Sequence, residues 1–158
     1  MTHQVFAERI IAMQQTLYHM SAMLLYQECD REDAVQSCIE KAWQKQGQLK
    51  KDEAMQSWVI RILINECHNI LRQKMRMVPL EELPEREAPP DADADLYAFF
   101  VGLPEKLRLP MVLFYVEGYS LKDIAATLRL SPATVKGRLY RGREKMKQDK
   151  AFQEVQGL

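Results

Sequence analysis

A cluster of prolines near the middle of the chain constrains its fold more than any other feature. Four of the seven prolines fall in the segment VPLEELPEREAPPDADAD, residues 78–95. They are Pro79, Pro84, Pro89 and Pro90. Because proline removes a backbone donor and fixes φ, such a cluster interrupts regular structure and favours extended chain. We therefore predict a flexible acidic linker at 79–95 between two small domains, 1–78 and 96–158.

Charge is distributed unevenly along the same division. The chain has 22 basic and 22 acidic side chains and no formal net charge, which taken alone disfavours nucleic-acid binding. Residues 79–101, however, hold one basic and seven acidic side chains, whereas residues 102–158 hold eleven and six. The neutral total is a cancellation between an acidic linker and a basic C-terminal domain. One hypothesis is that the linker screens that basic domain in the free protein.

Outside the linker the apolar residues recur at helical spacing. Steps of three and four join Phe6, Ile10, Met13, Leu17, Met20 and Leu24. Similar spacing marks 33–43, where we place Ala34, Val35, Cys38, Ile39, Ala42 and Trp43 on one helix, and a third helix is expected over 52–74. Strand-like alternation is absent, so we predict an all-α fold of two small helical domains.

The segment 118–141 has the spacing of a helix-turn-helix. Ser120 with Asp123, and Ser131 followed by Pro132, are start signals for two short helices separated by a tight turn. With Val135 and Leu139 turned inward, six residues lie outward or beside that face: Thr134, Lys136, Gly137, Arg138, Tyr140 and Arg141. Such a helix suits the DNA major groove. The alternative is a helical hairpin with a solvated basic face.

Two polar faces stand out in the N-terminal domain. Trp58, Arg61, Asn65, His68 and Arg72 share one side of the third helix, with Asn69 beside them and Lys74 and Arg76 extending the basic end. An aromatic ring, amides and cations on one face can stack on and hydrogen-bond unpaired bases. Asp33, Gln36 and Glu40 form a separate face on the second helix, for which solvation or helix capping is the simpler explanation.

These segments together resemble the extracytoplasmic-function sigma factors, the small bacterial initiation subunits of RNA polymerase. Residues 30–43 resemble the family's core-polymerase-binding segment, 57–72 its helix for the −10 element, and 103–144 its domain for the −35 element. Three such segments in order cover nearly the whole chain. Four positions depart from the usual pattern, namely Ser37, Met55, Asn69 and Gly137. Because the last two lie at base-contacting positions, the promoter sequence cannot be transferred from other members.

The resemblance implies a role for each group of residues. It assigns core-polymerase binding to Asp33, Gln36 and Glu40; −10 DNA to Trp58, Arg61, Asn65, Asn69, Arg72 and Arg76; and −35 DNA to Thr134, Lys136, Gly137, Arg138, Tyr140 and Arg141. It implies an alternative sigma factor that binds core RNA polymerase and promoter DNA and assists promoter melting. We also expect control by a separate anti-sigma factor, as is common in the family.

Other classes of protein find less support in the sequence. A free-standing DNA-binding regulator, with the N-terminal domain as a dimerisation or sensing module, is the second hypothesis. His3, His19 and His68 are far apart and no phosphate-binding glycine loop occurs, so we expect no enzyme, metal, cofactor or small-molecule substrate. No apolar run approaches the roughly 18–20 residues of a membrane span. Three unpaired cysteines, Cys29, Cys38 and Cys67, and the lack of a signal peptide favour the cytoplasm.

Overall fold

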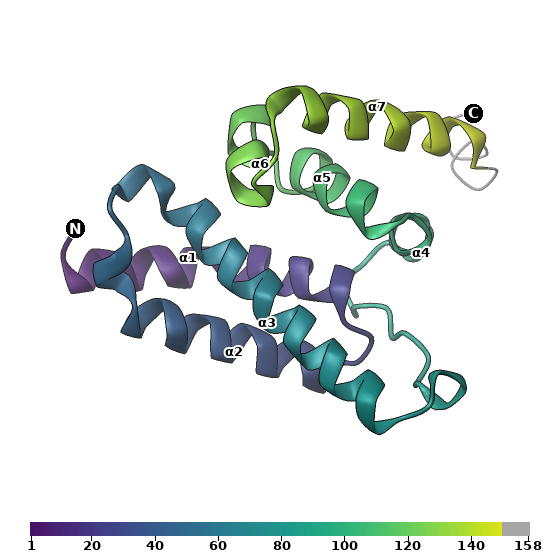
Figure 1. The fold of residues 1–158 in the computed structure, drawn as a ribbon, viewed down its shortest axis with the longest axis horizontal. Coiled ribbons are helices and arrows are strands. Elements are labelled where there is room, and N and C mark those ends of the chain that lie inside the picture. The colour runs from purple at the N-terminus through teal and green to yellow at the C-terminus, as the bar shows by residue number, and fades with distance from the viewer. Residues whose placement is uncertain (150–158) are drawn as a thin grey trace. The chain divides into compact units, whose positions relative to one another are not determined.

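The computed structural model describes residues 1–149, which form helices and connecting segments without a strand (Figure 1). The prediction of an all-α fold is therefore confirmed. The chain divides into two compact units, Met1–Glu87 and a second unit that begins at Ala88. The end of the predicted C-terminal domain, residues 150–158, lies outside the described residues. Within the described residues, no helix has the length and apolar character that a membrane span requires.

Three long helices pack together in the first unit. They are α1 (His3–Leu24), α2 (Glu28–Gln44) and α3 (Met55–Met77), with short 3₁₀ turns η1 (Gln46–Gln48), η2 (Asp52–Ala54) and η3 (Leu80–Glu82). The predicted stripe on α1 is buried from Phe6 to Leu24. Ala34, Cys38 and Ala42 of α2 are fully buried, and their small side chains allow the neighbouring helices to approach closely.

The first part of the predicted linker belongs to this unit. After η3, Glu87 donates its backbone N–H to the Tyr26 carbonyl at 2.8 Å, in the turn between α1 and α2. The side chain of Arg86 donates to the carbonyls of Ala22 and Leu25 at 3.1 and 3.2 Å. Residues 79–87 are thus built into the N-terminal unit, and the segment between this point and the next helix is short. The flexibility of 79–95 stays a prediction.

The second unit is built from α4 (Ala94–Gly102), α5 (Glu105–Tyr115), α6 (Leu121–Leu128) and α7 (Pro132–Gln148). Its core includes Met111, Val112 and Leu113 of α5, Ile124 of α6, and Val135 and Leu139 of α7, all nearly or fully buried. Helices α5 and α7 meet at Gly142, where an added Cβ would lie 2.6 Å from Met111 Sδ. A side chain at this crossing would displace the buried side chain of Met111, so glycine allows the two helices to approach closely.

Candidate nucleic-acid interface

The local geometry of α6 and α7 is that of a helix-turn-helix. Ser120 Oγ accepts the Asp123 N–H at 3.1 Å, and Ser131 Oγ accepts the Thr134 N–H at 3.1 Å, so both expected N-caps are present. Between the helices, Arg129 adopts the left-handed conformation with φ 56° and ψ 49°. The Leu130 N–H then bonds the Ala125 carbonyl at 2.9 Å and closes the turn. Two capped helices joined by a tight turn hold α7 in a fixed orientation relative to α6.

The outward side of α7 presents the residues expected from the sequence, and we call it the α7 face. It consists of Thr134, Lys136, Gly137, Arg138, Tyr140 and Arg141, each exposed or half-buried. The Tyr140 side chain is 58% exposed, whereas Val135 and Leu139 are buried beneath it. Among residues 1–149, Lys136, Arg138 and Arg141 form no ion pair. The cations of this face are therefore available to an external anion.

Gly137 lies in the middle of the α7 face without an internal reason for being glycine. A Cβ added there would lie 3.6 Å from Arg141 Nη1, which is ordinary van der Waals contact. The chain itself could therefore accommodate alanine at this position. Close approach to an external backbone or base, as the sequence suggested, stays a prediction.

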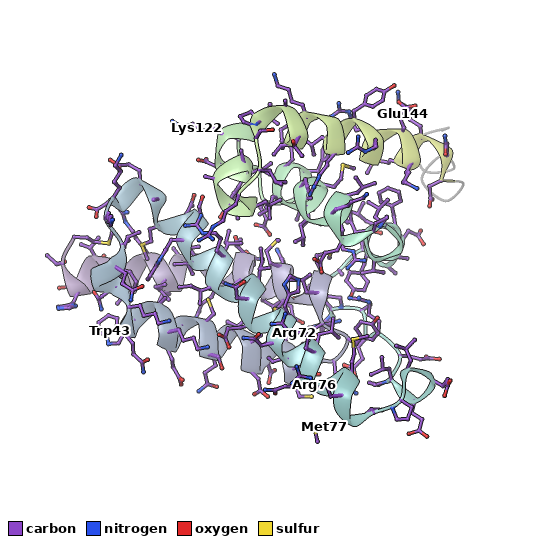
Figure 2. The ribbon with its side chains drawn as sticks, viewed as in Figure 1. Trp43, Arg72, Arg76, Met77, Lys122 and Glu144 are labelled. Atoms are coloured by element: carbon purple, nitrogen blue, oxygen red, sulfur yellow. The ribbon has the colours of Figure 1, made fainter. Side chains whose placement is uncertain are left out.

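Two further exposed cations belong to the helix-turn-helix but lie outside the α7 face, and they were missed in the sequence. Lys122 lies exposed at the start of α6, where Figure 2 labels it, and Arg129 lies exposed in the turn. Neither follows the spacing of the α7 face, which is why a search along that helix passed over them. Local charge was the only signal that could have found them.

The polar side of α3 is partly engaged with its own unit. This α3 face comprises Trp58, Arg61, Asn65, Asn69, Arg72 and Arg76, and Figure 2 labels Arg72 and Arg76 on the helix. Asn65, Asn69, Arg72 and Arg76 are exposed, whereas Trp58 and Arg61 are half-buried. The Trp58 ring meets Phe6 edge-on at 6.4 Å between centroids, and the Arg72 guanidinium donates to Asn69 Oδ1.

Lys74 does not extend the α3 face. Its ammonium group contacts Asp30 Oδ2 and Gln27 Oε1 at 2.6 Å each, so it joins α3 to the start of α2. The exposed basic end of α3 is formed by Arg72 and Arg76 alone among the cations expected there. Three lysines of the loop between α2 and α3, Lys45, Lys50 and Lys51, are exposed as well and were not anticipated.

The second helix carries a surface of mixed polar and apolar side chains. Asp33, Gln36 and Glu40, which we call the α2 face, are exposed as expected. The expected helix over 33–43 is present, but on it Val35 and Ile39 are only half-buried and Trp43 is 46% exposed. Trp43 is labelled near the end of α2 in Figure 2. Shallow grooves between α1 and α2 are lined by Gln36, Ile39, Glu40, Trp43 and Ile11 together with neighbouring residues.

Burial shifts the pKa of several titratable side chains among the described residues. Burial raises the pKa of the Cys38 thiol to about 12, with a smaller contribution from the charge of Glu66. Burial likewise raises the pKa of Tyr119 to about 12. Within the described residues no group of three or more His, Cys, Asp or Glu side chains could hold a metal ion.

The fold and its exposed faces define a two-unit helical protein with a helix-turn-helix DNA-binding element. Residues 94–146, which span α4 to α7, match the family model described as Sigma-70, region 4. RNA polymerase sigma-H factor of Pseudomonas aeruginosa is 30% identical over 144 residues, covering 78% of this chain and 74% of that protein. The chain belongs to the extracytoplasmic-function family of RNA polymerase sigma factors.

Other relatives agree with this assignment. ECF RNA polymerase sigma factor SigM of Mycobacterium tuberculosis is 30% identical over 122 residues, covering 74% of this chain and 62% of that protein. The chain thus spans less than two thirds of the length of that relative. The fold resembles the sigma factor RpoE solved in complex with the anti-sigma factor NepR from Bartonella quintana, with a TM-score of 0.80, 24% identity and 98% coverage of each chain.

Proposed function

We propose that this chain is an alternative sigma factor that binds core RNA polymerase, directs it to specific promoters and assists their melting, with no covalent chemistry of its own. One observation carries the proposal. A helix-turn-helix unit matching sigma-70 region 4 occurs in the same chain as a separate helical bundle with an exposed face of amides and cations. A protein that only binds duplex DNA needs the first of these and not the second.

The α7 face is proposed to contact the −35 element in the major groove. Lys136, Tyr140 and Arg141 would meet base edges around Gly137, and Thr134 and Arg138 would meet phosphates. Exposed cations that form no ion pair among the described residues support this role, since their charge is not neutralised within the chain. Each good base contact contributes about 1–3 kcal/mol of discrimination.

The α3 face is proposed to hold unpaired bases of the −10 element. Unpairing and flipping a base costs a few kcal/mol, which stacking and hydrogen bonds must offset. Trp58 offers a ring, Asn65 and Asn69 offer amides, and Arg61, Arg72 and Arg76 offer cations. The exposed lysines of the α2–α3 loop would add attraction for the backbone of the open strand.

The α2 face is proposed to bind core polymerase. Asp33, Gln36 and Glu40 lie next to the apolar side chains of Ile39 and Trp43, so the surface offers carboxylates around an apolar strip. A partner helix with basic and apolar side chains would complement it. This mixed character favours a protein partner over simple solvation.

An anti-sigma factor and a cytoplasmic location complete the proposal. One solved sigma factor similar in fold, RpoE, is described in complex with the anti-sigma factor NepR, and a second similar structure is that of CnrH in complex with the cytosolic domain of CnrY. A buried thiol at Cys38 and another at Cys67 are compatible with a reducing compartment.

Co-purification with core polymerase tests the proposal. We expect the tagged chain to retain core subunits at near-equal stoichiometry, and Gln36→Ala or Asp33→Ala to reduce the amount retained. Gln48→Ala is the matched control, since Gln48 is exposed in η1, beyond the end of α2 and outside the α2 face. Retention of promoter DNA without any core polymerase would favour a free-standing regulator and contradict the proposal.

A further inference from the structure

Residues Leu83–Glu87, which we call the clasp, are held to the turn between α1 and α2. The centre of the contact is Arg31, which is fully buried. Its guanidinium donates to the Glu87 carbonyl at 2.6 Å, and the Glu87 N–H donates to the Tyr26 carbonyl at 2.8 Å. The Glu87 carboxylate also accepts the N–H of Glu28, at the first residue of α2, at 3.4 Å.

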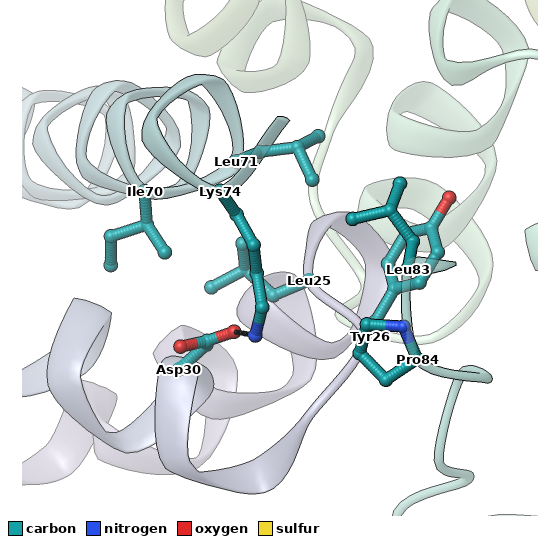
Figure 3. A pocket seen from close by; sticks show the side chains of 8 residues that line it. All are labelled: Leu25, Tyr26, Asp30, Ile70, Leu71, Lys74, Leu83 and Pro84. Carbon is teal, nitrogen blue, oxygen red and sulfur yellow. Dashed lines mark hydrogen bonds and ion pairs between the residues drawn. The ribbon is translucent and has the colours of Figure 1, made fainter. Parts of the chain in front are cut away.

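Two neighbouring contacts extend the clasp. The Arg86 guanidinium lies 4.3 Å from the centre of the Tyr26 ring, where a cation–π interaction is favourable. Leu83 and Pro84 border a small hollow with Leu25, Tyr26, Ile70 and Leu71, as Figure 3 shows. An acidic, proline-rich segment thus joins α1, α2 and α3 through side chains and backbone together.

The clasp can open without leaving a buried charge unpaired. Arg31 keeps Glu28 Oε1 at 2.6 Å and the carbonyls of Leu25 and Tyr26 at 3.1 and 3.2 Å, all of which belong to the bundle. Leu83 and Pro84 are only half-buried, and Glu87 is exposed. Because the buried arginine retains its main partners, opening chiefly exposes polar groups that water can satisfy.

The clasp also sets the length of chain that can separate the two units. With the clasp closed, only residues 88–93 lie between it and α4, a reach of about 20 Å at roughly 3.3–3.6 Å per residue. With the clasp and η3 released, the tether runs from Pro79 to Asp93 and reaches about 50 Å.

The difference between the short and the long tether matters because the two promoter elements lie a fixed distance apart. Elements centred near −10 and −35 lie about 25 base pairs apart, or about 85 Å along the duplex at roughly 3.4 Å per base pair. Compact units of this size measure about 30 Å across. With the short tether fully extended, the two units and the tether together reach about 80 Å, which is just less than the separation of the two elements. With the long tether they reach about 110 Å, which exceeds that separation by about 25 Å.

We propose that Leu83–Glu87 is a detachable clasp which shortens the tether in the free protein and opens when both units bind one promoter. This inference rests on the proposed function, because only a protein that contacts two separated elements needs the longer reach. The clasp would disfavour DNA binding away from polymerase, since opening has to be driven by contacts that the complete complex supplies.

A reversible lock tests the inference. The Glu87 N–H donates to the Tyr26 carbonyl at 2.8 Å, so the backbones of the two residues are direct neighbours, and a disulfide spans Cα separations of about 4.4–6.8 Å. Tyr26→Cys with Glu87→Cys, in a Cys29→Ser background, would lock the clasp on oxidation. We expect the oxidised form to give at least about tenfold less run-off transcript with core polymerase than its own reduced form. Glu87→Cys alone, treated identically, is the control and should not respond.

Equal transcription by the oxidised and reduced forms of the double variant would contradict the proposal that the clasp opens when both units bind one promoter. Failure of the unmodified chain to support any transcription would instead contradict the proposed function, so the two outcomes are distinguishable. Circular dichroism before and after oxidation verifies that the helices persist in both forms.

Amide hydrogen exchange tests the contact itself without transcription. Arg86→Ala removes the cation–π contact and two hydrogen bonds, and we expect exchange of the Glu87 amide in the free protein to rise at least about tenfold. Glu85→Ala is the matched control, because Glu85 is exposed in the same segment. Equal Glu87 exchange rates in both variants and the unmodified chain would show that the clasp is not held as described.

Discussion

The α7 face and the α3 face carry similar side chains, but their surroundings differ. On α7, the cations Lys136, Arg138 and Arg141 of the α7 face lie on a helix that is held by N-caps and a tight turn, and these three form no ion pair among the described residues. On α3, Trp58 meets Phe6, Arg72 bonds Asn69, and Lys74 is tied to Asp30. A duplex can be bound by a rigid, free surface, whereas flipped bases need a surface that is shaped by its neighbours. The comparison suggests that each unit is organised for one form of DNA.

Core truncations should produce the largest effects and separate the two units. Leu139 is 2% exposed and Leu63 is fully buried. We expect Leu139→Ala and Leu63→Ala each to lower the free energy of unfolding of their own unit by about 2–5 kcal/mol. Chemical denaturation of each variant, with hydrogen exchange to localise the change, measures this.

The functional consequences of these truncations should be opposite. Leu139→Ala should abolish binding to duplex −35 DNA and leave core-polymerase retention intact. Leu63→Ala should abolish core-polymerase retention and leave binding to duplex −35 DNA intact. Loss of both properties in either variant would show that the two units do not act separately.

Removing a cation from the α7 face should have the next largest effect. We expect Arg141→Ala or Lys136→Ala to weaken binding to a −35 duplex by about 1–3 kcal/mol if a base contact is lost. Lys145→Ala is the matched control, because it removes the same charge farther along α7 and outside the face. Fluorescence anisotropy at fixed salt measures the affinities. Equal losses in Lys145→Ala would show that α7 acts through its net charge alone.

Removal of the N-cap of α7 should have a smaller effect, and one that is confined to the stability and duplex affinity of the second unit. Ser131→Ala removes the acceptor for the Thr134 N–H and should lower the free energy of unfolding of the second unit by about 1 kcal/mol. Thr2→Ala at the cap of α1 is the counterpart in the first unit, since Thr2 Oγ1 accepts the Val5 N–H at 3.1 Å. Duplex affinity should fall for Ser131→Ala and not for Thr2→Ala. A fall in both would mean that the helix-turn-helix does not bind independently.

The smallest effect at neutral pH concerns Cys38 in the first unit. Burial raises its pKa from the ordinary 9.0 to about 12, so the unfolded thiol ionises first. Its contribution to stability is fully present below pH 9 and is lost as pH rises toward 12. Cys38→Ala should therefore flatten the decline in unfolding free energy of the first unit above pH 9. Parallel pH profiles for both proteins would contradict this.

Local patterns in the sequence predicted much of this organisation, and long-range contacts account for what was missed. The cap pairs at Ser120 and Ser131 and the periodic stripe on α1 act over a few residues, so spacing alone indicated them. The pairing of Lys74 with Asp30 joins residues 44 positions apart, which no local pattern reveals. Val35, Ile39 and Trp43 have core-like spacing, but the apolar side chains of α2 that the bundle buries are the small ones of Ala34, Cys38 and Ala42.

The sequence did not predict the clasp for a different reason. Arg31 binds the segment through the backbone carbonyl of Glu87, a group that every residue possesses, so the composition of residues 83–87 indicated only an unstructured acidic linker. Predicting its position required the path of the chain in three dimensions.

Run-off transcription with purified core polymerase on genomic fragments tests the central claim most directly. We expect discrete transcripts that require both the chain and core polymerase, that start at a shared pair of sequence elements, and that decrease with Arg141→Ala but not with Lys145→Ala. Specific binding of the chain to duplex DNA, with no transcript dependent on core polymerase, would contradict the account.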